Sequence, residues 1–473
     1  MYKTVIGLEV HCELKSNSKN FSSAKNGFSD IPNSNVSVVD LGMPGILPVV
    51  NKGAVRNSIK MALAMNCTVP DYLTFERKNY FYPDLPKGYQ ITQFKHPIGT
   101  NGYVMINVNG IEKKVLIHDT HLEEDTASMD HYNDYSLLDY NRCGVPLLET
   151  VTEPCLNSAD EAIAFLETLR NIFLYTDTSY ARSDKGQIRV DVNVSLMKED
   201  AKELGTRVEM KNINSFSGVR EAIISEVARQ TEILNNGGII LQETRRYDEN
   251  TNLTYTMRSK EDAIDYRYFT DPNLPPVKID INWVEEIKSE IPKLPQDRFK
   301  TYVSEYNINE KDAYTIVRDK NVSDFYEECI KLLKEPVLIS NWLCGDVMKY
   351  LNKDSLTIMD SKLNPTMLTD LIKMIKDGKI NGKQGKTVLE KMMDTGEDAN
   401  VIVTKLGLTQ ISNEDEIREI ILSVINENSN LVDDYKNGKN VFGYIVGLIM
   451  KSTNGKANPA ITSKLLKEEL EKL

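Results

Sequence analysis

Residues 4–14 alternate polar and apolar side chains with a period of two, which predicts a β-strand with two different faces. One face offers apolar side chains to a core, namely Ile6, Leu8, Val10, Cys12 and Leu14. The other face carries Gly7, Glu9, His11 and Glu13. Because Glu9 and His11 are two residues apart, their side chains point the same way, roughly 7 Å apart along the strand. Such a pair can share a metal ion or a water; a solvated outer face is the alternative.

The size and composition are those of an ordinary soluble globular protein. A chain of 473 residues, 41% hydrophobic and 27% charged, predicts two to four domains that each bury a core. The net charge of −12 argues against nucleic-acid binding over the whole surface and leaves room for a local basic patch. Six scattered cysteines without a C-x-x-C pair predict free thiols in a reducing compartment: Cys12, Cys67, Cys143, Cys155, Cys329 and Cys344.

The N-terminus shows no signal peptide, because the strand pattern begins at once without a basic region and an apolar block. The longest apolar run, residues 441–450, is too short to span a bilayer. We therefore expect a cytoplasmic protein that does not bind membranes.

Hydrophobic periodicity predicts an α+β fold in three parts. Residues 1–294 are rich in strand patterns and should form a cradle domain on a mostly antiparallel sheet with packed helices. Two of these helices are predicted at residues 158–176, where Ser158 and Glu161 suggest a capping box, and at residues 217–235. After a proline-containing linker the spacing becomes helical, which predicts an all-α helical domain at 295–403 and a small all-α tail domain at 404–473. The tail's first helix should begin at a cap formed by Ser412 and Asp415.

Four predicted strand segments share a polar face: residues 4–14, 187–196, 207–211 and the stretch around His121. A purely solvated face usually carries Lys, Glu and Thr, whereas this one offers His, Asn, Asp, Glu and Arg together. That mixture favours a polar catalytic floor.

Residues 118–125 contain the densest cluster of metal-ligand side chains, namely His118, Asp119, His121, Glu123, Glu124 and Asp125. Mg²⁺ prefers oxygen ligands and binds through one or two carboxylates plus substrate phosphates, whereas imidazole suits softer metals. In an extended chain Glu123 and Glu124 face opposite ways, so either of them could be the ligand. An acidic turn is the alternative.

The loop at residues 77–90 has two prolines and a glycine, yet it holds four aromatic rings among cations. Such a loop suits stacking on a nucleobase and binding of its phosphates, or it is tucked onto the core by its rings. Residues 139–149 look like a turn that presents Asn141 and Arg142, residues 211–216 lead into a helix N-terminus, and 242–248 and 265–269 add arginines. Each could be structural, but their number favours a phosphorylated substrate.

Six lysines near the C-terminus occur without a carboxylate between Tyr435 and Lys467: Lys436, Lys439, Lys451, Lys456, Lys464 and Lys467. In so acidic a chain this local reversal of sign suits an RNA backbone; a solvated helical face is the alternative. The sequence has no G-x-x-x-x-G-K-[ST] loop, no dinucleotide fingerprint and no G-x-S-x-G elbow. Any use of ATP is therefore not of the P-loop kind.

Taken together, residues 7–11, 77–90, 121–125, 139–146, 211–216 and 265–269 resemble the signatures of the B subunits of bacterial aspartyl/glutamyl-tRNA amidotransferases. The resemblance runs from residue 1 to 473, and the segments 438–440 and 455–459 are similar to the family's tail domain. It implies phosphorylation of the side-chain carboxylate of Glu-tRNA(Gln) or Asp-tRNA(Asn) with ATP and Mg²⁺. Ammonia from a glutaminase partner then displaces the phosphate, and a further small partner joins the two in a heterotrimer.

By this resemblance Glu9, His11 and Glu124 match catalytic and metal positions, with Glu123 and Glu149 as further candidate metal ligands. Contacts to the nucleotide or the aminoacyl end are assigned to Lys78, Tyr80, Tyr82, Asn141 and Arg142. Contacts to the nucleic acid are assigned to Lys436, Lys439, Lys451 and Lys456.

One departure concerns zinc. Many family members carry two cysteine pairs near the N-terminus that bind zinc, but here the corresponding segments, 21–24 and 36–40, offer serines. Serine cannot replace a thiolate ligand, so we expect no zinc and a loop held by packing alone.

Two rival functions stay open. A non-catalytic tRNA-binding scaffold would hold no metal near Glu9. An ATP-dependent ligase acting alone would have to use free ammonia, because the chain shows no glutaminase motif.

Overall fold

The computed structural model describes residues 2–213, 215–248, 251–259, 265–408, 413–453 and 455–472. The chain separates into two compact units, Met1–Gln296 and Asp297–Leu473. The further division of the helical part at residue 403 stays a prediction.

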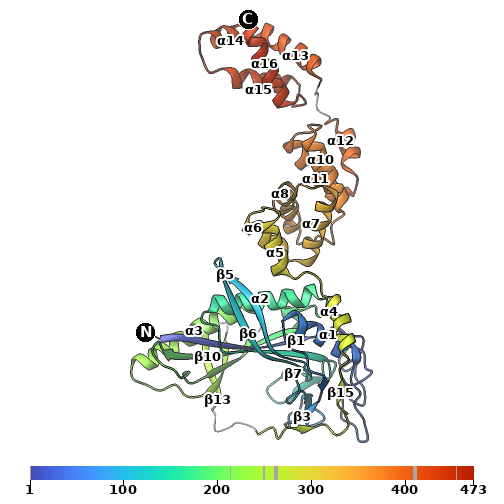
Figure 1. Ribbon diagram of the computed structural model, residues 1–473, viewed down its shortest axis with the longest axis vertical. Coiled ribbons are helices and arrows are strands. Elements are labelled where there is room, and N and C mark those ends of the chain that lie inside the picture. Colours follow the sequence, from blue (N-terminus) through green and yellow to red (C-terminus); the bar gives the residue numbers. More distant parts are fainter. Residues whose placement is uncertain are drawn as a thin grey trace. The chain divides into compact units, whose positions relative to one another are not determined.

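The N-terminal unit is built on an eight-stranded sheet in the order β13-β12-β11-β10-β1-β9-β6-β5 (Figure 1). All described pairings in it are antiparallel except β11 with β12, which is parallel. Its strands are β1 (Tyr2–Glu13), β5 (Gly99–Val108), β6 (Ile111–Glu124), β9 (Pro146–Thr152), β10 (Ile188–Lys198), β11 (Val208–Ile213), β12 (Glu243–Asp248) and β13 (Leu253–Ser259).

Three helices cover one face of this sheet (Figure 1): α1 (Lys52–Ala64), α2 (Ala159–Tyr175) and α3 (Phe216–Asn235). The apolar side chains of β1 pack against them, so Ile6, Leu8 and Val10 are almost completely buried. Ser158 caps α2 as predicted, but the Glu161 carboxylate accepts from the Asn157 backbone N–H, so the capping box is only half formed. The α+β prediction is confirmed.

Three small sheets complete the described part of the unit. In one of them β3 (Glu76–Asn79) lies between β14 (Phe269–Thr270) and β4 (Tyr89–Thr92). The others pair β15 (Val277–Lys278) with β2 (Tyr72–Leu73) and β7 (Ser128–His131) with β8 (Ser136–Asp139). A 3₁₀ turn, η1 (Ser183–Lys185), precedes β10, and α4 (Ile281–Ser289) packs on α1.

The loop between β1 and α1 is held by more than packing, which corrects the prediction. The ammonium of Lys19 lies 3.2 Å from the carboxylate of Asp40, and both side chains are buried. The same ammonium donates to the backbone carbonyl of Tyr140. The Asn20 amide donates to the backbone carbonyl of Glu123 over 2.9 Å and so ties the loop to the end of β6.

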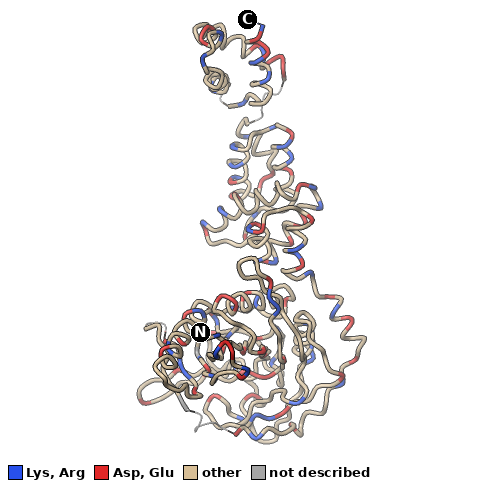
Figure 2. Tube along the Cα trace, turned by 60° about the vertical axis from the view of Figure 1, so that its left-hand side comes forward, with Lys and Arg blue, Asp and Glu red and all other residues tan. Residues whose placement is uncertain are grey.

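The C-terminal unit is helical. It contains α5 (Pro295–Ser304, which begins in the linker), α6 (Glu310–Val317), α7 (Lys320–Leu332), α8 (Pro336–Trp342), the π-helical turn η3 (Leu343–Val347), α9 (Met348–Lys353), α10 (Pro365–Lys376), α11 (Gly382–Thr395), α12 (Ala399–Leu406), α13 (Glu414–Glu427), α14 (Ser429–Lys436), α15 (Phe442–Ser452) and α16 (Pro459–Lys472). Asn413 caps α13, whereas the predicted cap Ser412 lies outside the described residues. Figure 2 shows basic and acidic positions interspersed along these helices. Across the described ranges no helix is long and apolar enough to cross a membrane.

Candidate functional site

The polar face of β1 lies at the centre of the candidate site, because β1 has strands on both sides. His11 is opposite Glu149 on β9, and Glu149 is opposite His121 on β6. Glu123, two residues after His121, points to the same face. The antiparallel register therefore brings together side chains that lie up to 138 residues apart, from His11 to Glu149.

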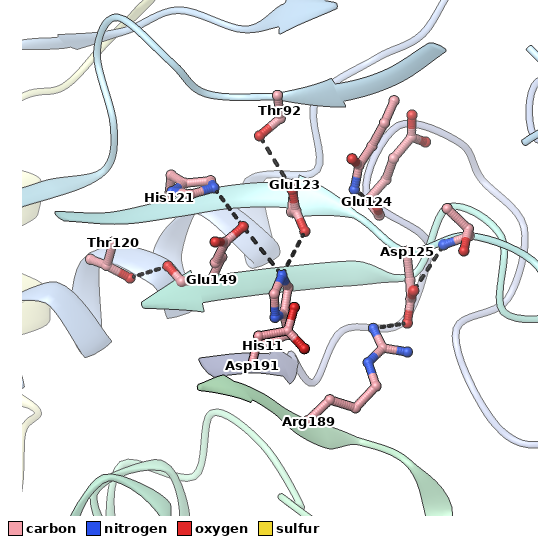
Figure 3. A network of polar contacts seen from close by, with 12 residues as sticks. His11, Thr92, Thr120, His121, Glu123, Glu124, Asp125, Glu149, Arg189 and Asp191 are labelled. Carbon is pink, nitrogen blue, oxygen red and sulfur yellow. Dashed lines mark hydrogen bonds and ion pairs between the residues drawn. The ribbon is translucent and has the colours of Figure 1, made fainter. Parts of the chain in front are cut away.

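Four side chains converge here and point toward one another (Figure 3). The Glu149 carboxylate lies 3.2 Å from His11 Nε2 and 3.0 Å from His121 Nε2. His11 Nε2 is also 3.8 Å from a Glu123 oxygen, and Thr92 donates to the other oxygen of Glu123 over 3.3 Å. His11, Glu123 and Glu149 can each offer one ligand atom within 4.8 Å of the others. This geometry suits one cation.

The charges of this group depend on one another. Burial alone would lower the pKa of His11, but the Glu149 carboxylate outweighs it and raises that pKa to about 9. Burial alone would raise the pKa of Glu149, but His11 and His121 hold it well below its usual value. Burial and the Glu149 charge raise the pKa of Glu123. Without a cation the cluster thus balances its carboxylates with protonated imidazoles.

A second group lies beside the first on the same face. Glu9, Asp191 and Glu209 can each offer an oxygen within 4.8 Å of the others. The Lys211 ammonium occupies this group, at 2.8 Å from Asp191 and 3.1 Å from Glu209. Glu9 also accepts from the Asn193 amide over 3.0 Å. Glu9 and His11 were predicted to share a single metal ion, whereas the structure puts them in two neighbouring groups.

Glu124 does not join either group. Its side chain points away from Glu123 (Figure 3) and lies buried against the Lys87 ammonium, at 2.5 and 2.6 Å from its two oxygens. The backbone N–H of Ile91 also donates to it over 2.9 Å. The structure thus brings together Glu123, His11 and Glu149 of the predicted set, while a catalytic or metal-binding role for Glu124 stays a prediction.

Among the proposed nucleotide contacts, Lys78 lies close enough to Glu123 and Glu149 for their charges to act on its ammonium. Burial alone would lower the pKa of its ammonium, but Glu123 and neighbouring groups outweigh that effect and raise it. The ammonium also lies over the Tyr266 ring, 5.0 Å from its centroid. The Tyr80 ring contacts Tyr266 edge-on, and Tyr82 is exposed. These side chains remain candidates for binding a nucleotide.

Asn141 and Arg142 have structural partners. The Asn141 amide donates to the Ile31 carbonyl over 2.8 Å and its oxygen accepts from the Asn35 backbone N–H. Arg142 donates to the backbone carbonyls of Thr126 and Ala127. In this structure both side chains brace loops around the site, and their proposed substrate contacts stay predictions.

The four tail lysines proposed to contact nucleic acid differ in ion pairing and in exposure. Lys439 pairs with Asp434 at 2.8 Å, a partner just outside the interval that lacks carboxylates. Lys436 and Lys451 are exposed and Lys456 is half-buried. Their contact with nucleic acid stays a prediction.

His121, Asp119, Asp191, Glu209 and Lys211 fall within the predicted polar segments, but none of them was predicted as an individual site residue. The available signal was the alternation of these strands, which puts Asp191 and Glu209 on the polar face. Asp119 belongs to the predicted cluster of metal-ligand side chains, but in the structure its carboxylate lies 2.8 Å from His121 Nδ1 and so orients the ring toward Glu149.

This sheet with its polar, cation-competent face belongs to a described class of catalytic domain. Residues 4–285 match the family model of the GatB/GatE catalytic domain, and residues 324–470 match that of the GatB domain. Similar proteins are the B subunits of the aspartyl/glutamyl-tRNA(Asn/Gln) amidotransferases of Thermoanaerobacter pseudethanolicus (47% identity over 473 residues, all of both chains) and of Halalkalibacterium halodurans (48% over 473 residues, all of this chain and 99% of the relative). That of Caldicellulosiruptor saccharolyticus is 46% identical over 478 aligned positions, which cover both chains completely. The chain belongs to this family, the B subunits of the aspartyl/glutamyl-tRNA(Asn/Gln) amidotransferases.

Proposed function

We propose that this chain activates the side-chain carboxylate of Glu-tRNA(Gln), Asp-tRNA(Asn) or both, within a heterotrimer that also contains a glutaminase and a small third protein. A carboxylate is a poor electrophile, so the reaction needs an acyl phosphate. The carboxylate oxygen attacks the γ-phosphorus of ATP and ADP leaves. Ammonia from the glutaminase then attacks the acyl carbon and inorganic phosphate leaves, which gives the amide.

The observation that carries this proposal is the convergence of His11, Glu123 and Glu149 from three adjacent strands. The second group, Glu9, Asp191 and Glu209, offers only oxygen atoms, which are the ligands that Mg²⁺ prefers. The first group includes an imidazole and therefore also accepts softer divalent metals. The donor atoms thus fit two divalent cations of the kind that accompany ATP, the second of which would displace the Lys211 ammonium from its place between Asp191 and Glu209.

Divalent cations bound here would neutralise negative charge on the phosphoryl oxygens during transfer. Side chains of this chain position the carboxylates that would bind these cations. His121, held by Asp119, orients the Glu149 carboxylate, and Thr92 fixes Glu123. Lys78 supplies a cation near Glu123 that can bind a phosphoryl oxygen. A scaffold without catalysis would not require this arrangement.

The test is amidation by the assembled heterotrimer, with glutamine, ATP and Mg²⁺ and each mischarged tRNA in turn. Glu149→Gln removes the charge shared by His11 and His121, so we expect amidation to fall at least a hundredfold while the three proteins still co-purify. Glu153→Gln, a change at an exposed carboxylate just after β9, is the matched control and should retain activity. Wild-type complex that amidates neither tRNA would contradict the proposal.

A further inference from the structure

The outer strands β12 and β13 present two different faces. Toward α3 they bury Arg245, Tyr247 and Thr254. The opposite face, the same one that carries the cation groups, exposes large side chains. The exposed fractions are 52% for Leu253 and 43% for Tyr255. An edge strand that keeps such side chains uncovered is a candidate binding surface.

Strand pairing connects this outer face with the second candidate cation-binding group, which consists of Glu9, Asp191 and Glu209. Glu9 is opposite Asp191 on β10, Lys211 on β11 is opposite Arg246 on β12, and Arg246 is opposite Tyr255 on β13. Between β10 and β11 the connection is an ion pair, in which the Lys211 ammonium lies 2.8 Å from Asp191. With strands about 4.8 Å apart, Arg246 lies about 14 Å and Tyr255 about 19 Å across the sheet from Glu9.

The side chains that follow one another across these paired strands become less neutralised and more exposed with distance from Glu9. Lys211 is neutralised by Asp191 and Glu209. The Arg246 side chain is exposed and makes no ion pair or hydrogen bond with any residue that the structure describes. Beyond it lies the exposed Tyr255 ring, whose hydroxyl donates to Thr251 at the end of the hairpin. An unpaired guanidinium followed by an exposed ring suits a phosphate followed by a base.

We propose that this outer face of β12 and β13 binds the single-stranded 3′ end of the aminoacylated tRNA, with Arg246 on a backbone phosphate and the Tyr255 ring stacked on a terminal base. The inference rests on the proposed function, since it needs the substrate's carboxylate at the cation groups. A glutamyl or aspartyl ester with its ribose and base has a length comparable with the distance from the cations to this face. The central strands of the sheet thus bind the reacting carboxylate of the substrate, and the edge strands bind the terminal nucleotide of the tRNA.

The test uses the assembled heterotrimer, saturating ATP and glutamine, and increasing concentrations of glutamyl-tRNA. Arg246→Ala and Tyr255→Ala should each raise the KM for the tRNA about tenfold and leave the KM for ATP unchanged. Tyr255→Phe keeps the ring and should retain the wild-type KM. Arg246→Ala should also flatten the salt dependence of binding by about one phosphate contact. The matched control is Arg220→Ala, an exposed arginine on α3 behind the sheet.

An unchanged KM for the tRNA in both alanine variants would overturn the inference. So would loss of the glutaminase or of the small third protein from folded Tyr255→Ala complex, since the face would then be a protein interface. If an alanine variant does not fold, Arg246→Gln gives the same comparison with less change in side-chain volume. Failure of the wild-type complex to amidate any tRNA would instead refute the proposed function, so the two failures are distinguishable.

Discussion

Glu124 is the side chain whose proposed role and observed contacts differ most. It matches a catalytic position by resemblance, yet it forms a buried ion pair with Lys87 on the face of β6 opposite Glu123. Removing one partner of a buried ion pair leaves an uncompensated charge and typically costs about 3–5 kcal/mol. We expect Glu124→Ala to abolish amidation while the partners still assemble, and to lower the free energy of unfolding by that amount, measured by urea denaturation.

The two effects can be separated by removing both charges. The double variant Glu124→Leu with Lys87→Met should recover most of the lost stability, because no unpaired charge stays buried. If Glu124 takes part in catalysis, this variant remains inactive. Near wild-type amidation by Glu124→Ala would refute the catalytic assignment, and recovery of activity in the double variant would show that Glu124 acts through stability alone.

At the scale of strands and helices, the sequence predicted which faces are polar but not which side chains meet. Alternation along β1, β10 and β11 was enough to place Glu9, His11 and Asp191 on one face. Which of them share a cation depends on strand register, and that is set by long-range pairings and by the bulge between Val190 and Val192. Glu9 therefore groups with Asp191, and His11 groups with Glu149.

The choice between Glu123 and Glu124 has the same physical origin. Alternation requires the two to face opposite ways, but only the pairing of β6 with β9 decides which one lies on the polar face. Lys87 comes from a loop whose path local sequence does not determine, so its pairing with Glu124 could not be predicted.

The loop between β1 and α1 leads to a prediction about metal and stability. Lys19 is paired to Asp40 in a buried position, so an internal ion pair stabilises the loop. We expect metal analysis of the purified chain to find no stoichiometric zinc. Lys19→Met should lower the free energy of unfolding by about 3–5 kcal/mol, because it leaves Asp40 buried and unpaired.

The double variant Lys19→Met with Asp40→Leu is the control for that loss and should recover part of it. Lys25→Met, a change at an exposed lysine of the same loop, should have little effect. Stoichiometric zinc, or a Lys19→Met variant as stable as the wild type, would contradict this account of the loop.

At the scale of the whole molecule, hydrophobic periodicity predicted the change from a sheet-based unit to a helical one. The observed units meet at Gln296 and Asp297, next to the proline-containing linker read from the sequence. Within the helical unit, buried side chains form one cluster from Tyr302 to Val403 and another from Ile417 to Leu470. Helical spacing alone does not determine which helices pack against one another within each cluster, because that depends on which apolar faces meet.

Both units contain thiols that are buried or, for Cys344, half-buried, and their response to pH has a direction that follows from that burial. Burial raises the pKa of Cys67 and Cys143 in the first unit, and of Cys329 and Cys344 in the second, to about 12. An unfolded thiol ionises near its ordinary value of 9.0. Between these values the unfolded state releases protons that the folded state keeps, so the free energy of unfolding should fall as pH rises above about 9.

The same burial should protect these thiols from alkylation. At pH 8.5 a thiol of pKa about 12 has about a thousandfold less thiolate than an ordinary one, and the thiolate is the reactive form. We expect iodoacetamide to leave Cys67, Cys143, Cys329 and Cys344 unmodified in the native chain and to modify all four in urea, as read by mass spectrometry of peptides. Ser183→Cys, at an exposed position of η1, is the positive control and should react at once. Rapid native modification of the cysteines of one unit would show that its core opens under native conditions, because neither burial nor a raised pKa allows that reaction in the closed state.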